Sequence, residues 1–263
     1  MVILCVSLLM TMIHFIPQKA RKTILEWAQN DTLTVCLLGL AGSGKSAIAR
    51  WIHGHSPRSM EPFTIFNPGA DLYAALENNP SGTLYIEEVA QLPLKQQKRM
   101  MEFMKHRMLK PEGGIQPQRI FRTRIIAGSD ENMEKRVRAG MFSDELLAIL
   151  EKNQITLPTL SERGEDFDSV ALGLLHELAL QAECAEVRSI TPEALAMLKE
   201  YPWPGNMREL RNVLWYGIEH CKDSELTLND LPDLKALGEQ FRATRSGFES
   251  WLASQGIREK TDR

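Results

Sequence analysis

The chain has 263 residues, of which 43% are hydrophobic and 25% charged, and its formal net charge is −3. This length suffices for one large domain or two small ones, and the composition is that of an ordinary globular protein. The small negative charge excludes a general electrostatic attraction to nucleic acid, so nucleic-acid binding would require a local basic patch. Four widely spaced cysteines show no metal-ligand spacing, which favours a reducing, cytoplasmic setting. They are Cys5, Cys36, Cys184 and Cys221.

Residues 1–18 form an apolar segment that ends at Pro17 and includes "VILCVSLLMTMIHFI". It lacks the positive charge that precedes the apolar core of a signal peptide. It is also shorter than the roughly 20 apolar residues of a membrane-spanning helix. We therefore expect a segment buried against the following domain, or an artefact of the assigned translation start, and no membrane association.

Helical and strand patterns alternate over residues 19–157. "KARKTILEWAQ", "AIARWIHGH" and "LKQQKRMMEFMKHRM" have helical spacing, and "LTVCLL", "FTIF", "GTLYIEEV" and "RTRIIAG" are short apolar runs typical of strands. Such runs, bounded by turn residues, are typical of strands buried on both faces of a parallel sheet. The pattern predicts an α/β domain with a doubly wound parallel sheet.

Residues 158–232 contain helical patterns and no convincing strand, so we expect a smaller helical domain. One helix should begin within "TPEALAMLKEY", with Thr191 as N-cap and Pro192 in the first helical position. The tail, residues 233–263, has the pattern of one more helix. It is too short for a complete helix-turn-helix with a basic recognition face, which argues against direct DNA binding.

"GLAGSGKS" has the form G-x-x-x-x-G-K-[ST], and it lies between a predicted strand and a predicted helix. Glycines let the backbone N–H groups face phosphates without obstruction. The lysine neutralises the β and γ phosphate oxygens, and the serine hydroxyl can bind Mg²⁺. We therefore predict a nucleotide site made by Gly39, Gly42, Ser43, Gly44, Lys45, Ser46 and Ala47.

Two adjacent acids, Glu87 and Glu88, end the apolar run of "GTLYIEEV". A nucleotide-hydrolysing site needs a carboxylate for the metal and another for the attacking water. We predict that Glu87 supports Mg²⁺ and that Glu88 polarises the water. The alternative is a pair of solvated acids at a strand end, but their place after a strand expected beside the phosphate loop favours the functional interpretation.

Five blocks occur in order: "GLAGSGKSAIARWIHGHSPR", "GTLYIEEVAQLP", "RTRIIAGSDENMEKRVRAGMF", "LPTLSERGEDF" and "YPWPGNMRELRNVL". Over about residues 19–232 the chain resembles the AAA+ domain of bacterial sigma-54-dependent activators, the NtrC-like enhancer-binding proteins. The resemblance implies an α/β domain followed by a helical lid, with ATP and Mg²⁺ as cofactors. Because the family usually works as a hexameric ring, it also implies a homo-oligomer.

The resemblance assigns roles to further residues. Asn67 matches an asparagine that restrains the catalytic glutamate, and Ser129–Asp130 occupy the sensor I position, where the family usually has Thr-Asn. Arg208 matches the sensor II arginine of the lid, which reaches the nucleotide phosphates. The alternative for Arg208 is a surface helix arginine, but the preceding "WPGN" turn sets a sharp helix entry that argues against it.

The chain also departs from the family pattern. Only "PGADLYAALENNPS" separates Asn67 from Gly82, so the GAFTGA loop that engages sigma-54 RNA polymerase is absent. Where the family has two arginine fingers, "FSDELLAIL" has Ser143 and Ile149, although Arg136 or Arg138 lies nearby. Glu87 also replaces the usual aspartate, which lengthens the carboxylate arm by one methylene.

Three functional hypotheses follow. The first is an ATP-binding regulatory or assembly factor that binds ATP or ADP through Lys45, Ser46 and Arg208, with weak or absent hydrolysis and a protein partner the sequence does not identify. The second is an active ATPase that remodels a protein other than sigma-54 polymerase. The third is a transcriptional regulator that acts through a DNA-binding partner. We favour the first, because the binding groups are retained while groups that act on the transition state are altered.

Overall fold

The computed structural model describes residues 12–111, 113, 117–182, 184, 186–234 and 236. The residue contacts divide the chain into two units between residues 159 and 160, close to the predicted boundary between 157 and 158. Most of the predicted apolar segment and nearly all of the predicted helical tail lie outside the described residues.

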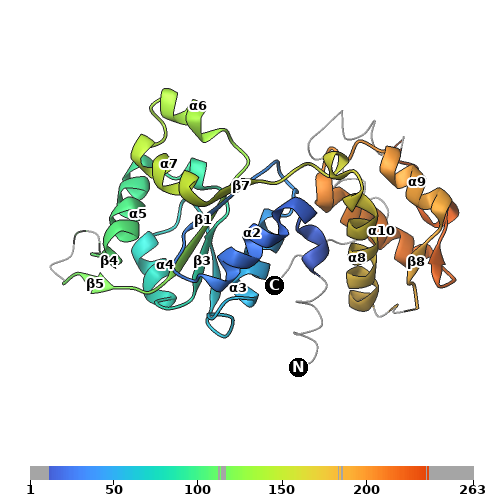
Figure 1. Ribbon diagram of the computed structural model, residues 1–263, viewed down its shortest axis with the longest axis horizontal. Helices are drawn as coiled ribbons and strands as arrows, with labels where there is room; N and C mark the ends of the chain where they lie inside the picture. The colour runs from blue at the N-terminus through green and yellow to red at the C-terminus, as the bar shows by residue number, and fades with distance from the viewer. Residues whose placement is uncertain are drawn as a thin grey trace. The chain divides into compact units, whose positions relative to one another are not determined.

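The first unit is built on a parallel sheet of five strands in the order β2-β3-β6-β1-β7 (Figure 1). All four predicted strands are present, which confirms the predicted α/β fold. The sequence did not reveal β7, because this three-residue strand pairs only with β1 at the sheet edge and buries little of its side-chain surface. The strands are β1 (Val35–Leu38), β2 (Phe63–Phe66), β3 (Thr83–Ile86), β6 (Arg124–Ser129) and β7 (Gln154–Thr156).

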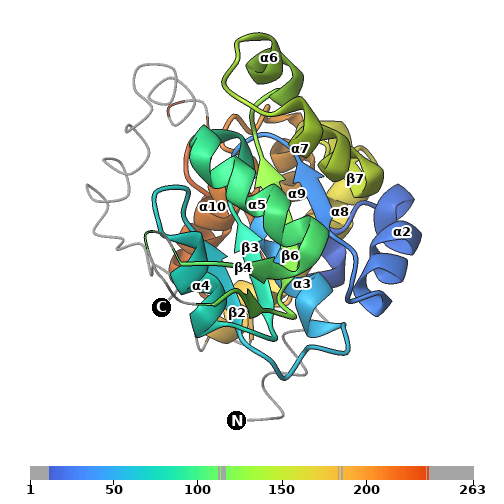
Figure 2. The same cartoon turned by 90° about the vertical axis from the view of Figure 1, so that its left-hand side faces the viewer.

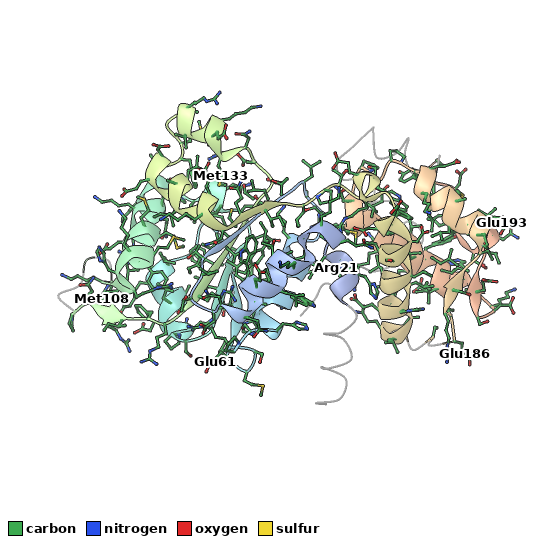
Figure 3. All side chains as sticks on the ribbon, viewed as in Figure 1. Arg21, Glu61, Met108, Met133, Glu186 and Glu193 are labelled. Carbon is green, nitrogen blue, oxygen red and sulfur yellow. The ribbon has the colours of Figure 1, made fainter. Side chains whose placement is uncertain are left out.

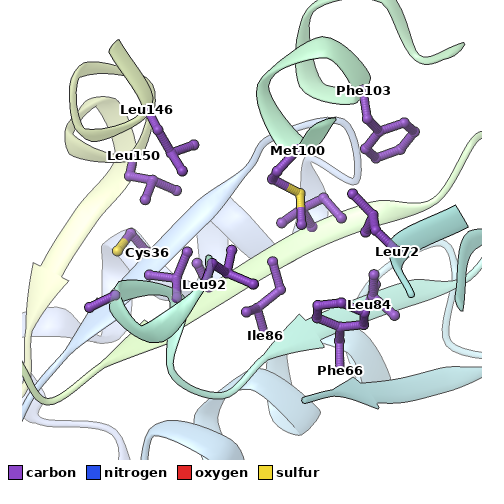
Figure 4. Close-up of a cluster of buried hydrophobic side chains, with 14 of the residues drawn as sticks. Cys36, Phe66, Leu72, Leu84, Ile86, Leu92, Met100, Phe103, Leu146 and Leu150 are labelled. Carbon is purple, nitrogen blue, oxygen red and sulfur yellow. The ribbon is translucent and has the colours of Figure 1, made fainter. Parts of the chain in front are cut away.

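Alternate side chains of the central strands enter two separate cores, one on each face of the sheet. Cys36, Leu84 and Ile86 lie in the core (Figure 4) that packs against α4 (Leu72–Asn78), α5 (Leu94–His106) and α7 (Asp144–Leu150). The intervening side chains enter the core on the other face, against α2 (Gln18–Gln29) and α3 (Lys45–Gly54). Burial on both faces explains why these strands are almost continuously apolar.

Figure 2 views the first unit from the side of α4 and α5, which lie in front of β3 and β6. Three one-turn helices, a short hairpin and one further helix complete this unit. They are η1 (Met12–Phe15), η2 (Val89–Gln91), η3 (Glu151–Asn153), the strands β4 (Met108–Leu109) and β5 (Arg119–Ile120), and α6 (Met133–Arg138). Met133 marks the start of α6 in Figure 3.

Buried contacts attach the start of the described chain to the sheet. Ile16, which follows η1, is 1% exposed and packs in the core formed with α2 and α3. Arg124, at the start of β6, is fully buried and donates hydrogen bonds to the backbone oxygens of Trp27 (2.6 Å) and Leu33 (3.2 Å). Burial lowers the pKa of Arg124 to about 10, so its guanidinium stays charged at neutral pH.

The second unit is mainly helical. The longest helices in its described part, α8 (Asp166–Gln181) and α10 (Asn206–His220), pack together, and Arg211 donates hydrogen bonds to Glu177 (3.3 Å) and Gln181 (2.8 Å). Two short strands pair in parallel, contrary to the expectation of none, because two-residue strands leave no periodic pattern in the sequence. The other elements are η4 (Ser161–Arg163), β8 (Ser189–Ile190), α9 (Pro192–Glu200), β9 (Glu225–Leu226) and η5 (Leu228–Asp230).

Helix α9 begins as predicted. The Thr191 hydroxyl accepts a hydrogen bond from the Ala194 N–H (3.3 Å), and Pro192 occupies the first turn. Across the described part of the chain, no helix combines the length and the hydropathy needed to cross a membrane.

Replacing Thr191 with alanine should lower the free energy of unfolding by about 1 kcal/mol, because the Ala194 N–H loses its acceptor. Urea denaturation followed by circular dichroism measures this change. Glu200→Ala, at the exposed last position of α9, is the control and should change stability by less than about 0.5 kcal/mol. Equal effects of the two substitutions would contradict a capping role for Thr191.

Candidate functional site

A glycine-rich loop connects the carboxyl end of β1 to α3. Gly44 has φ 98°, a left-handed conformation that favours glycine, and it directly precedes the helix. At Gly39 an added Cβ would lie 2.6 Å from Ser43 Oγ, so a side chain would collide with the loop. The loop therefore has the local geometry expected of a phosphate-binding loop at a helix N-terminus.

Lys45 is the first residue of α3 and is buried. Its ammonium group donates hydrogen bonds to the backbone oxygens of Gly39 (2.8 Å) and Leu40 (3.4 Å). The same Nζ lies 3.6 Å from Glu88 Oε1. The structure thus brings together the predicted lysine and the predicted catalytic glutamate, residues 43 positions apart in the chain.

Ser46 and Glu87 also meet at this end of the sheet. The Ser46 hydroxyl donates to Glu87 Oε1 over 3.5 Å, which is long for a hydrogen bond. Hydroxyl and carboxylate oxygens are ligands suited to Mg²⁺, and one or two protein ligands beside phosphate oxygens are typical of its sites. The two residues therefore fit the predicted magnesium site.

The end of β6 connects the loop with the acids. The Asp130 N–H donates to Glu88 Oε2 (2.9 Å), and the backbone oxygen of Ser129 accepts from the Gly39 N–H (3.1 Å). The Ser129 hydroxyl is buried and accepts from the Glu131 N–H (3.2 Å). These backbone contacts were not expected from the sequence, although the adjacency of β3, β6 and β1 in the sheet requires such neighbours.

The surroundings of Glu88 favour its protonated form. Burial raises the pKa of this carboxyl above its ordinary value, and the Asp130 carboxylate adds to the rise. The hydrogen bond from the Asp130 N–H and the positive charge of Lys45 act in the opposite direction. A carboxyl group with a raised pKa beside a phosphate loop is suited to accept a proton from water.

Three predicted cofactor contacts lie in or beside the loop. Gly42 has φ 75°, Ala47 is in the first turn of α3, and Ser43 is buried with no hydrogen-bond partner for its hydroxyl among the described residues. Two other predicted residues remain predictions. Asn67 is exposed directly after β2, and the described residues show no hydrogen bond between it and Glu88. Arg208 is exposed on α10 in the second unit.

The two residues at the predicted arginine-finger positions lie at the start of α7 and within it. Ser143 is the N-cap of α7, since its hydroxyl accepts from the Leu146 N–H (3.3 Å), and Ile149 is half-buried on the same helix. Of the nearby arginines, Arg136 pairs with Glu131 (2.7 Å), and Arg138, whose side chain is 79% exposed, pairs with Glu134 (3.6 Å).

Comparison with known proteins gives two family matches that together cover most of the chain. Residues 17–160 match the family described as sigma-54 interaction domain, and residues 161–246 match the AAA+ ATPase lid domain. Among curated relatives, the DNA-binding transcriptional regulator NtrC of Escherichia coli K12 is 30% identical over 237 residues, covering 81% of this chain and 49% of NtrC.

Other relatives are similar to this chain to about the same degree. A putative NtrX-like response regulator of Rickettsia conorii is 32% identical over 217 residues, covering 75% of this chain and 45% of the regulator. The crystal structure of Brucella abortus NtrX in complex with ADP has 28% identity and a TM-score of 0.71, covering 84% of this chain and 54% of NtrX. NtrX in complex with ATP has 27% identity and a TM-score of 0.67, covering 90% and 60% of the two chains. The chain thus spans about half the length of these curated relatives.

The raised pKa of Glu88 predicts a pH-dependent difference between the wild type and Glu88→Gln. A carboxyl whose pKa is higher in the folded state adds stability while protonated, and this contribution is lost as pH rises through the folded pKa. Glutamine does not titrate. The free energy of unfolding of Glu88→Gln should therefore rise relative to the wild type as the pH increases above about 4.5, the ordinary value for a glutamate, and through the raised pKa of Glu88.

Urea unfolding at several pH values, without nucleotide, measures this difference. Glu200→Gln controls for the removal of an exposed glutamate elsewhere. A difference between Glu88→Gln and the wild type that stays constant, or that falls with pH, would contradict the described environment of Glu88.

Proposed function

The chain belongs to the sigma-54 interaction domain family of AAA+ ATPases, and from this premise we propose that it is an ATP-binding regulatory or assembly factor with weak or absent hydrolysis. The observation that supports this proposal most directly is the cluster at the end of the sheet. There Lys45 is buried in the phosphate loop, 3.6 Å from Glu88. Family relatives of similar fold bind ATP and ADP, as the NtrX complexes do.

In this proposal the loop from Gly39 to Ser46 binds the phosphates of ATP or ADP. Its backbone N–H groups and the Lys45 ammonium neutralise the phosphate charge, and the positive end of α3 adds to the attraction. Ser46 and Glu87 bind Mg²⁺, which neutralises charge on the phosphate oxygens when bound. Asn67 and Arg208 remain candidate contacts, to the catalytic glutamate and to the phosphates respectively.

Weak hydrolysis is expected from the residues at the positions where the family has arginine fingers. Glu88 is placed to accept a proton from water, but Ser143 and Ile149 stand where the family has arginine fingers. An arginine finger contributes about 10³–10⁵ in rate. Ser143 instead caps α7, so its side chain has a local structural role. A site that keeps its binding groups and loses groups specific to the transition state should bind ATP well and hydrolyse it slowly.

The proposal also excludes direct contact with sigma-54 polymerase. Between β2 and β3 the chain forms the seven-residue helix α4 and short turns, which supports the prediction from the sequence that the GAFTGA loop is absent. We propose that ATP or ADP occupancy controls binding to a protein partner in the cytoplasm. A homo-oligomer remains part of this proposal through the family resemblance.

A second candidate is an active ATPase, favoured by Arg138, whose side chain is largely exposed and pairs with the exposed Glu134 on the same helix, so that it could exchange this pair for the site of a neighbouring copy. The third candidate function is that of a transcriptional regulator whose partner supplies the DNA contacts. It is favoured by the NtrC relatives, which are named as DNA-binding regulators and of whose length this chain spans about half.

ATP binding and single-turnover hydrolysis of the purified full chain distinguish the first two candidates. Lys45→Ala should weaken ATP binding at least about 10-fold, because charge-assisted hydrogen bonds to phosphate are removed. Lys152→Ala, an exposed lysine of η3, is the matched control and should bind ATP like the wild type. Hydrolysis by the wild type should be no faster than hydrolysis by Glu88→Gln.

Turnover that increases steeply with protein concentration, and that Glu88→Gln abolishes, would favour an active ATPase completed by a neighbouring subunit. Arg136→Ala and Arg138→Ala would then identify the arginine. Retention of DNA by the purified protein at physiological salt would favour the third candidate.

A further inference from the structure

Tyr85 is a buried polar residue of β3, two positions before Glu87. Its side chain is fully buried on the sheet face that packs against α2 and α3. No group in the described residues forms a hydrogen bond with its hydroxyl. A buried hydroxyl without a hydrogen-bond partner lowers the stability of the folded protein. Either the protein tolerates this loss of stability, or the hydroxyl gains a partner when a ligand occupies the site.

Gly128 of the neighbouring strand β6 makes the space for this hydroxyl. A Cβ added to Gly128 would lie 2.6 Å from the Tyr85 hydroxyl oxygen and 2.8 Å from the backbone oxygen of Glu87. Any residue other than glycine would therefore collide with both groups. A phenylalanine at position 85 would remove the first of these collisions, so the hydroxyl is one of two groups that require glycine at position 128.

The hydroxyl of Tyr85 lies on the same side of the sheet as Ser46. Burial raises the pKa of the Tyr85 hydroxyl and the neighbouring Ser46 side chain acts to lower it, yet the two hydroxyls form no hydrogen bond of normal geometry. Ser46 in turn reaches Glu87 Oε1 only over 3.5 Å. Ser46 thus lies beside both Tyr85 and Glu87, without a hydrogen bond of ordinary length to either.

We propose that Tyr85 is a positioning residue of the magnesium site, and that its hydroxyl donates a hydrogen bond to Ser46 Oγ when Mg²⁺ and ATP bind. A serine hydroxyl has one donor and two acceptor positions. Ser46 then donates to Glu87, accepts from Tyr85 and directs its remaining lone pair toward the metal. This inference rests on the proposed ATP-binding function.

The test compares Tyr85→Phe with the wild type in the full chain, by calorimetric titration with ATP. One titration contains excess Mg²⁺ and the other contains EDTA. Tyr85→Phe should bind ATP about 5- to 10-fold more weakly with Mg²⁺, the effect of one lost hydrogen bond, and equally well in EDTA. Tyr73→Phe is the matched control, because Tyr73 is also buried with an unpartnered hydroxyl, but lies in α4 on the other face of the sheet.

Unchanged affinity of Tyr85→Phe with Mg²⁺ would overturn the proposal, as would an equal loss of affinity with Mg²⁺ and in EDTA. Absence of ATP binding by the wild type in both titrations would instead refute the proposed function, and the inference with it.

A second measurement applies even if Tyr85→Phe folds poorly. Gly128→Ala should destabilise the wild type, and Tyr85→Phe should reduce that loss in the double variant, because one of the two colliding oxygens is gone while the Glu87 backbone oxygen remains. A Gly128→Ala variant as stable as the wild type would show that the hydroxyl does not occupy this space, which also overturns the proposal.

Discussion

Strand β6 lies between β3 and β1, and backbone groups at its carboxyl end form hydrogen bonds with both the acid after β3 and the loop after β1. The Asp130 N–H donates to the Glu88 carboxylate, and the Ser129 oxygen accepts from the Gly39 N–H. One bond positions the acid and the other positions the start of the phosphate loop. The two backbone groups belong to consecutive residues, the last of β6 and the one that follows it, so this short segment holds the acid and the loop at a fixed separation. The proximity of Lys45 and Glu88 follows from this alignment.

Much of the first unit could be predicted from sequence, because strands buried on both faces must be apolar throughout. The runs that became β1, β3 and β6 show this pattern, and each is followed by residues of the site. Parallel strands end at a common edge, so the loop after β1 and the acids after β3 had to meet. The start of α9 was equally predictable, since a threonine before proline at a helix start has a local capping role.

Other features depend on distant parts of the chain and leave no local signal. The strands β7, β8 and β9 are too short to show periodicity. The approach of Tyr85 to Gly128 depends on the register between two strands, and a single sequence does not reveal which glycine faces which side chain. The role predicted for Arg208 requires contact between two units, which no local pattern specifies. Ser143 could be recognised as a helix cap only once the start of α7 was known.

The buried Arg124 gives the segment before the sheet a role in its construction. Its guanidinium has two backbone acceptors, at the end of α2 and in the turn that leads to β1. A shortened chain that began at the first strand would keep the whole phosphate loop, yet would leave a charged group inside the protein without its acceptors. A single buried arginine more than ninety positions along the chain thus makes α2 an integral part of the nucleotide-binding domain.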